Sequence, residues 1–301
     1  MDTIVRGSAS LLRAYYRHVP LAFGKRPVWD SVVRRLLPRG HALDLQARTR
    51  FGARMHVRFP DTIQSYVYFF GVWEPAITAW LTQTLAPGDT VIDIGANVGY
   101  DTLLASHLVG PAGRVHAIEA SPHVFALLGR NLALNRTANV TAHPVAVCAA
   151  PCEVPVFLHD ACNLGGTTIV PAVAARRGAR FEDSVPGRPL ADIVPEAEIL
   201  NARVIKIDVE GAEWPVVQGF ADLLPRLSPR TELLIEVSAE ALHDHGTTVP
   251  AFLALFRDAG FSPFGIGNRY TVDMYLEPVP AAPEPLTDEG FEQLDILFRR
   301  V

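Results

Sequence analysis

The stretch of sequence that decides the fold is Thr90-Val91-Ile92-Asp93-Ile94-Gly95-Ala96-Asn97-Val98-Gly99-Tyr100. Its first half is β-branched or apolar apart from Asp93, which predicts a buried strand over 90–94. Gly95 allows the backbone to turn sharply, and Gly99 lets a ligand and the next helix approach without a Cβ atom between them. A helix over 100–108 should follow, and its first N–H groups can bind an anionic group. We therefore predict a strand, a ligand-binding turn and a helix in succession.

Outward from this stretch, short apolar runs alternate with helical patterns, which is typical of an α/β fold with a mostly parallel sheet covered by helices. The second strand ends at Glu119, and Ser121 then caps a helix that has Pro122 in its first turn. Further helices are expected at 213–224 and 250–259. Strands are expected at 90–94, 115–118, 140–147, 204–208, 233–237, 261–266 and 271–276.

The first part of the chain, residues 1–85, does not follow this alternation. Helical patterns cover 11–16 and 28–37, and alternating patterns over 42–49 and 54–59 predict a small hairpin. We interpret this part as an accessory helical and hairpin segment rather than an independent domain.

The main domain is predicted to span 86–278 and to contain a long insertion at 148–202. The insertion is irregular and carries a basic loop, so we expect it to line the substrate site. That loop contains Arg176, Arg177 and Arg180. Residues 279–301 are expected to form a C-terminal tail, of which 291–298 is amphipathic and should dock as a helix.

Composition limits the partners of the protein. The chain has 301 residues and a net charge of −5, without the basic face that nucleic-acid binding requires. We find neither a signal-peptide pattern nor an apolar run long enough to span a membrane, so we expect a soluble, cytoplasmic protein with no membrane partner. A homo-oligomer stays open.

The three cysteines are Cys148, Cys152 and Cys162. A metal or redox cluster is one interpretation, but neither CxxC nor Cys/His ligand spacing is present. We favour reduced thiols in and beside strands, which is typical of an intracellular protein.

Residues beside the glycine turn indicate the cofactor. A dinucleotide fingerprint needs a second glycine where this chain has Asn97, and the carboxylate of Asp93 would repel a diphosphate. The same carboxylate suits a positively charged amino group, which S-adenosylmethionine carries. Glu119 stands where an acidic residue can accept hydrogen bonds from ribose hydroxyls, although it could instead be a solvated strand end. The pattern favours S-adenosylmethionine over NAD.

A second group of charged residues follows a central strand. With period two, Lys206, Asp208 and Glu210 start on one face of a strand that should otherwise be buried. Glu236 ends the next strand, and ligands bind at this edge of open α/β sheets. We predict that these residues form the floor of an active site; a structural ion pair of Lys206 with one carboxylate is the alternative.

Two further roles are open at this edge. Asp208 and Glu236 could hold Mg²⁺, although hydrogen bonds that orient a substrate are the favoured role. The general base for a hydroxyl could be Asp208, Glu210 or His243, and the histidine could equally be an ordinary loop residue.

Together these motifs resemble the FkbM family of methyltransferases. The resemblance lies in the stretch 91–100, in Glu119-Ala120-Ser121-Pro122 and in Lys206-Ile207-Asp208-Val209-Glu210-Gly211-Ala212-Glu213. It implies a class I, Rossmann-like methyltransferase fold with a seven-stranded sheet. It also implies O-methylation of hydroxyl groups, commonly on natural products or glycans.

The resemblance also implies roles for individual residues. Asp93, Gly95, Asn97 and Gly99, together with the adjacent Ala96 and Tyr100, would hold the methionine end of S-adenosylmethionine. Glu119 would bind the ribose beside Ala120 and Ser121. The backbone of Ala146 and Val147 would contact the adenine, and Asn163 and Gly166 match the family's Asn-x-Gly segment.

We therefore expect an S-adenosylmethionine-dependent methyltransferase that acts on a hydroxyl of a small molecule, either a natural product or a sugar. Two alternatives are a nucleotide-dependent oxidoreductase and a binding protein that keeps the fold without turnover.

Overall fold

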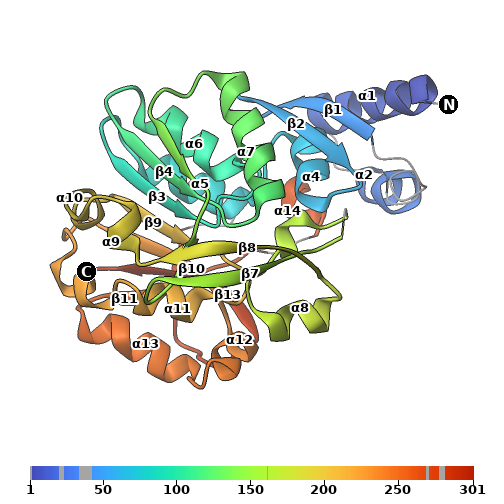
Figure 1. Ribbon diagram of the computed structural model, residues 1–301. Coiled ribbons are helices and arrows are strands. Elements are labelled where there is room, and N and C mark those ends of the chain that lie inside the picture. Colours follow the sequence, from blue (N-terminus) through green and yellow to red (C-terminus); the bar gives the residue numbers. More distant parts are fainter. Residues whose placement is uncertain (1, 20–23, 34–42, 161, 269–270, 278–281) are drawn as a thin grey trace.

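The structure is a computed structural model that describes residues 2–19, 24–33, 43–160, 162–268, 271–277 and 282–301 (Figure 1). At its centre is an eight-stranded sheet in the order β12-β11-β13-β10-β9-β3-β4-β5. Within this sheet, the adjacent strands β10, β9, β3, β4 and β5 are parallel to one another. Strand β13 is antiparallel to both of its neighbours, and β12 is antiparallel to β11. Their bounds are β3 Thr90–Ile94, β4 Arg114–Ile118, β5 Val140–His143, β9 Val204–Ile207, β10 Glu232–Ser238, β11 Ser262–Ile266, β12 Glu284–Pro285 and β13 Gln293–Arg299.

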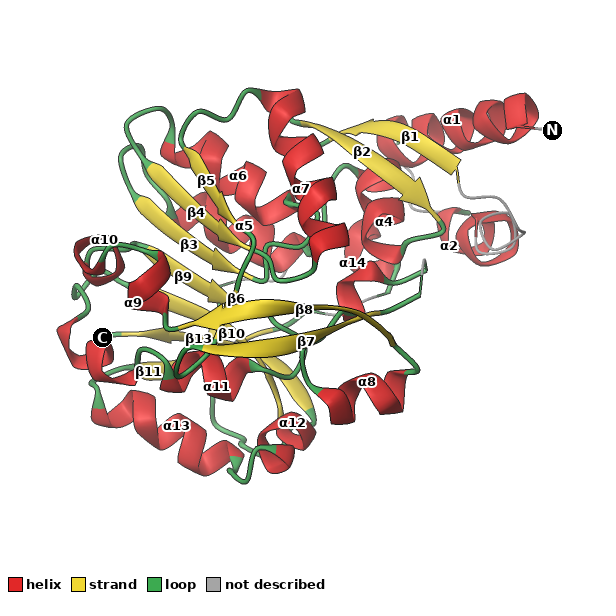
Figure 2. Cartoon of the chain, viewed as in Figure 1, coloured by secondary structure: helices red, strands yellow, loops and turns green. Residues whose placement is uncertain are grey.

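Helices cover both faces of this sheet (Figure 2). Alternate residues of the strands point to opposite sides, so that Val91 and Ile92 belong to two different hydrophobic clusters. The first cluster includes residues of α5 Pro75–Thr84, α6 Tyr100–Val109 and α7 Pro122–Asn135. The second includes residues of α9 Leu190–Ile193, α10 Glu196–Leu200, α11 Glu213–Gln218, η3 Ala221–Arg226, α12 Ala239–Asp244 and α13 Val249–Asp258. The predicted α/β class with a mostly parallel sheet is confirmed, whereas the predicted seven strands become eight.

Two predictions near the C-terminus are wrong. Residues expected to dock as a helix form β13, which lies inside the sheet between β10 and β11. Ile296 and Leu297 are buried on opposite faces, so the segment reads as a continuous apolar run that periodicity cannot distinguish from a helix. The expected strand 271–276 contains α14 Asp273–Leu276 instead. The C-terminal segment therefore belongs to the main domain and is not a tail, while the predicted boundary at 278 lies outside the described residues.

The insertion 148–202 is more regular than we expected. Its strands β7 Cys152–Leu158 and β8 Arg180–Arg188 pair with β6 Ala146–Val147 in a second sheet of order β6-β8-β7. The predicted third strand, 140–147, is thus divided between two sheets. Figure 2 shows α8 Pro171–Arg177 at one end of the β7–β8 pair, and a short helix, η2 Leu164–Gly166, precedes it in the chain.

The N-terminal segment packs against the main domain. Its helices are α1 Asp2–His18, α2 Lys25–Val28, a π-helix at Trp29–Val33 and α4 Thr62–Phe70; the end of the helix predicted over 28–37 lies outside the described residues. The predicted hairpin is confirmed as β1 Leu43–Arg48 and β2 Arg54–Phe59, which are antiparallel. Helix α7 provides hydrogen-bond acceptors for N–H groups on the edge of β2. The side-chain oxygens of Asn131 and Asn135 accept hydrogen bonds from the backbone N–H groups of His56 and Arg54, respectively.

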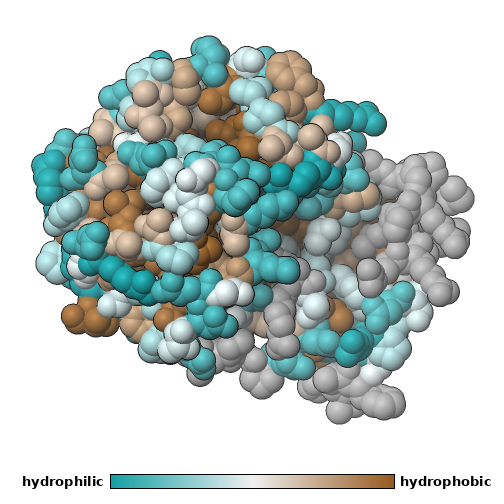
Figure 3. Space-filling model, turned by 90° about the horizontal axis from the view of Figure 1, so that it is seen from below, coloured by the Kyte–Doolittle hydropathy of each residue, from teal (hydrophilic) through white to brown (hydrophobic). Residues whose placement is uncertain are grey.

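None of the described helices is both long and apolar enough to cross a membrane. On the face shown in Figure 3, hydrophilic residues are interspersed with smaller hydrophobic areas.

Candidate active site

A cavity of about 540 Å³ lies where the parallel strands end, as expected for an open α/β sheet. Its wall combines the turn after β3, the end of β4, strand β6, the 163–169 segment and the residues after β9. Of the predicted site residues, those that line it are Ala96, Asn97, Gly95, Tyr100, Glu119, Ala120, Ser121, Ala146, Val147, Asn163, Lys206, Asp208, Glu210 and Glu236.

The turn after β3 contacts the backbone of Asp208, the first residue after β9, and this contact requires glycine at position 95. The φ of Gly95 is 84°, and a Cβ atom placed on it would lie 1.8 Å from the carbonyl oxygen of Asp208. The N–H groups of Gly95 and Ala96 both donate to the carbonyl of Ile118, at 2.9 and 3.0 Å. Because Gly95 has no side chain, the glycine turn can pack directly against the segment that carries Asp208 and Glu210, and both form part of the cavity wall.

Glu119 closes β4 and faces the turn. Its two carboxylate oxygens accept hydrogen bonds from the backbone N–H groups of Asn97, at 2.9 Å, and Ser121, at 2.8 Å. Burial raises the pKa of Glu119 to about 7, although these two hydrogen bonds act in the opposite direction. The carboxyl group therefore lines the cavity at a fixed position.

Three predicted cofactor residues lie behind the cavity wall. Asp93 is 2% exposed and accepts a hydrogen bond from the hydroxyl of Thr102, and burial raises its pKa. A Cβ atom on Gly99 would lie 2.5 Å from Leu128, so this glycine is needed for helix packing. Gly166 is buried beside His159. These residues can support the site, but they are not part of the cavity lining.

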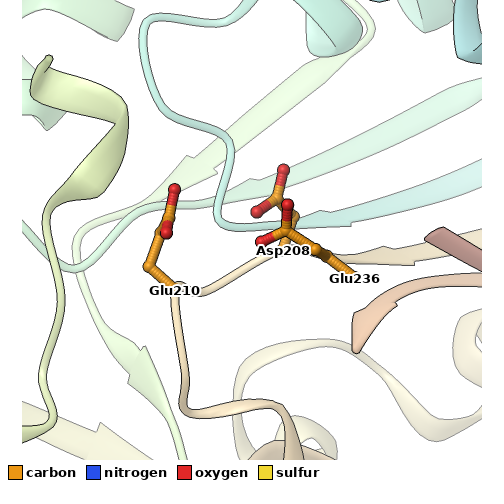
Figure 4. A group of neighbouring side chains, drawn as sticks. All are labelled: Asp208, Glu210 and Glu236. Carbon is orange, nitrogen blue, oxygen red and sulfur yellow. The ribbon is translucent and has the colours of Figure 1, made fainter. Parts of the chain in front are cut away.

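Asp208, Glu210 and Glu236 bring one carboxylate oxygen each within 4.8 Å of the others (Figure 4). Asp208 and Glu210 follow β9, and Glu236 belongs to β10. The ammonium group of Lys206 lies 2.9 Å from Asp208, which is the ion pair considered above as the alternative role of this lysine. The same ammonium lies 3.5 Å from Asp101 on α6.

Glu210 differs from Asp208 in its surroundings. Its backbone is left-handed, with φ at 55°, and its carboxylate forms an ion pair with Arg177 of α8. Burial, followed by the charge of Asp208, raises the pKa of Glu210 to about 7. Glu213 holds this loop in place, because its carboxylate accepts hydrogen bonds from the N–H groups of Val209 and Gly211.

A smaller hollow of about 140 Å³ adjoins the main cavity. Arg177, Glu210 and Glu236 line both spaces. The carboxylate group therefore stands between a larger space beside the glycine turn and a smaller one beside α8 and α12.

The structure does not bring His243 to this group. It is exposed on α12 and lies outside the cavity lining. Its neighbour His245 is occupied instead with the carbonyl of Gly211, at 2.9 Å.

Sequence reasoning missed several residues of the site. Asp101 lines the cavity, and its position in the first turn of the helix after the glycine turn was a usable signal. The sequence predicts Arg177 only as part of a basic loop, and no sequence pattern indicates its ion pair with Glu210. Asp295 lies outside the cavity lining, in a segment that the sequence predicts as a helix; burial, followed by the charge of Asp208, raises its pKa to about 7.

The mostly parallel sheet with helices on both faces, and with a cavity at the ends of its parallel strands, is the predicted class I, Rossmann-like methyltransferase fold. Residues 93–263 match the Methyltransferase FkbM domain. The 31-O-demethyl-FK506 methyltransferase FkbM of Streptomyces tacrolimicus is 32% identical over 59% of this chain and 74% of its own length. Methyltransferase sdnD of Sordaria araneosa is 27% identical over 57% of this chain and 73% of its own.

Among solved structures, a SAM-dependent O-methyltransferase from Thermotoga maritima aligns with a TM-score of 0.40 at 14% identity, covering 85% of this chain and 77% of its own. The protein belongs to the FkbM family of methyltransferases. Its cofactor is S-adenosylmethionine, as the sequence predicted, and the oxidoreductase alternative is set aside.

The residues present fit this cofactor. Asp101 lines the cavity, and one of its buried carboxylate oxygens has no hydrogen-bond partner among the described residues. Such an oxygen suits the ammonium group of the methionine part. Glu119 offers a carboxylate for the ribose hydroxyls, and the apolar side chains of Ile118, Val145 and Val147 suit an adenine ring.

Proposed function

We propose that this protein methylates a hydroxyl oxygen of a small molecule, either a natural product or a sugar. The observation that carries the proposal is the group of Asp208, Glu210 and Glu236, which shares one cavity with the glycine turn and Glu119. Carboxylates can accept the hydrogen bond of a hydroxyl and then its proton. The name of the Streptomyces relative, which gives 31-O-demethyl-FK506 as its substrate, supports attack by oxygen.

S-Adenosylmethionine, when bound, supplies an electrophilic methyl group. We assign Glu119 to its ribose, Asp101 to its ammonium group, and Ala146 with Val147 to the edge of its adenine. The protein then aligns the acceptor hydroxyl and excludes water, which provides most of the acceleration in a displacement of this kind. The hollow beside α8 offers space for the body of the acceptor.

Glu210 is the base that we favour. A general base works best when its pKa lies near the working pH, and the pKa of Glu210 is raised to about 7. Asp208 instead forms an ion pair with the ammonium of Lys206 at 2.9 Å, so its carboxylate is already engaged by a cation. We assign Asp208 and Glu236 to orienting the hydroxyl by hydrogen bonds.

The same ion pair bears on the Mg²⁺ hypothesis. The ammonium of Lys206 already neutralises Asp208, so that carboxylate has less need of a metal ion. We propose that methyl transfer proceeds with the carboxylates alone and that added Mg²⁺ does not raise the rate.

The test is methyl transfer from isotopically labelled S-adenosylmethionine to a panel of hydroxyl-bearing natural products and sugars, with protein dialysed against EDTA. We expect a product with one added methyl group, located on oxygen by NMR. The Asp208→Asn variant should be at least about tenfold slower, whereas Asp192→Asn, at an exposed position on α9, should match the wild type. Methylation of nitrogen or carbon, or turnover only with added Mg²⁺, would overturn the proposal.

A further inference from the structure

Two of the three cysteines lie side by side at the start of the insertion. Cys148 directly follows β6, and Cys152 begins β7. Their sulfur atoms are 3.3 Å apart. Cys148 is buried, and Cys152 is exposed. Neither residue has a part in the methyl transfer described above.

The strand between them is built to allow this contact. Cys152 is the register partner of Gly187 on one side of β8, and on the other side the N–H group of Cys148 donates to the carbonyl of Arg188 at 3.0 Å. A Cβ atom on Gly187 would lie 2.7 Å from the sulfur of Cys148 and 2.9 Å from that of Cys152. Glycine at this position therefore leaves the space in which the two sulfurs meet.

We propose that Cys148 and Cys152 are a redox-active dithiol that closes reversibly to a disulfide. A disulfide bond is about 2.05 Å long, so the sulfurs have only about 1.3 Å further to approach. The chemical partner is a low-molecular-weight disulfide such as oxidised glutathione, which accepts the two electrons that the thiols lose.

The exchange has two balanced steps. The Cys152 thiolate attacks oxidised glutathione, forms a mixed disulfide and releases one reduced glutathione. The Cys148 thiol then loses its proton and attacks the sulfur of Cys152, which forms the protein disulfide and releases the second reduced glutathione. Burial raises the pKa of Cys148 to about 11, so the exposed Cys152 should react first and Cys148 second.

The position of the pair connects it with the cavity wall. Ala146 and Val147, immediately before Cys148, line the cavity. The carbonyl oxygen of Cys148 lies 2.5 Å from where a Cβ atom of Gly219 would stand. A disulfide would therefore join β7 to the backbone directly next to the cofactor cavity.

The test uses the full chain, reduced, desalted and then incubated with oxidised glutathione, followed by intact mass measurement and peptide mapping without reductant. In the wild type, we expect the Cys148–Cys152 peptide to lose two hydrogens and to regain them on treatment with dithiothreitol. Cys162 is exposed and serves as the internal control, since it should keep one glutathione.

Two variants separate the steps. In Cys148→Ser, Cys152 should retain its glutathione because the second thiol is missing. In Cys152→Ser, Cys148 should stay unmodified because it is buried. A wild type that carries a stable glutathione on Cys152 together with a free Cys148 thiol would overturn the proposal.

Discussion

At the scale of single residues, the molecule distinguishes two neighbouring carboxylates by their partners. Asp208 lies against a buried ammonium group, whereas Glu210 is held by the guanidinium of Arg177 at the edge of the cavity. Because the pKa of Glu210 is raised to about 7, it is the carboxylate whose charge changes near neutral pH. The ionised form is the one that can accept a proton.

We therefore predict that kcat rises with pH and has an inflection near pH 7 that belongs to Glu210. Glu210→Gln should lower kcat by about 100-fold or more and remove the inflection, because the amide does not accept the proton. Asp208→Asn should lower kcat and keep an inflection that moves to lower pH, because the charge of Asp208 helps to raise the pKa of Glu210. The measurements are pH–rate profiles, with calorimetric affinity for S-adenosylhomocysteine as the control for folding. An unchanged profile in Glu210→Gln would contradict the assignment.

The residue scale also shows what the sequence could predict. Asp208 and Glu210 follow β9, and Glu236 lies near the end of the parallel strand β10, which places all three at one sheet edge. The strand period does not say which acids face the cavity. Asp93 turns to Thr102 behind the wall, while Asp101, in the first turn of α6, lines the cavity.

At the scale of elements, the contact between the turn after β3 and the exit of β9 fixes the shape of the site. Gly95 and Gly88 both have positive φ, at 84° and 91°, but only Gly95 has backbone where its Cβ atom would lie. We predict that Gly95→Ala costs about 3 kcal/mol or more in the free energy of unfolding. The matched variant Gly88→Ala should cost only about 1 kcal/mol, for the left-handed backbone.

Urea unfolding of both variants checks this prediction. Equal losses would mean that the contact with the Asp208 carbonyl does not constrain the turn. S-Adenosylhomocysteine should bind Gly88→Ala as it binds the wild type, because that residue lies outside the cavity lining.

Strands and helices could be predicted from the sequence where turn or capping residues mark their ends. The glycine turn separates β3 from α6, and Ser121 with Pro122 marks the start of α7, as the sequence indicated. The prediction failed for β13, because a strand buried on both faces shows no alternation of apolar and polar residues. The pairing of β7 with β8 was also hidden, since the register depends on contacts between residues far apart in the chain.

At the scale of the whole molecule, buried carboxyl groups outnumber the cations beside them. Several of these carboxyl groups have a raised pKa, and burial is the largest cause in every case. The pKa is raised to about 6 for Asp61 and Asp101, and to about 7 for Glu119, Glu210, Glu213 and Asp295. The folded protein therefore keeps protons that the unfolded chain, with ordinary carboxyl pKa values near 4, has already released. When the folded state binds more protons, stability falls as pH rises.

We accordingly predict that the ligand-free protein loses stability as pH rises from about 5 through 7, with Tm at pH 8 lower than at pH 6 by at least about 3 °C. His143 acts in the opposite direction only below about pH 6.5, because burial lowers its pKa. Thermal unfolding followed by circular dichroism across this range is the measurement. Glu213→Gln should reduce the slope, since its amide oxygen can still accept the N–H groups of Val209 and Gly211 without a charge. A Tm that increases steadily from pH 6 to pH 8 would show that these carboxyl groups are ionised in the folded protein, and the assignment of a neutral-pH base to Glu210 would fail with it.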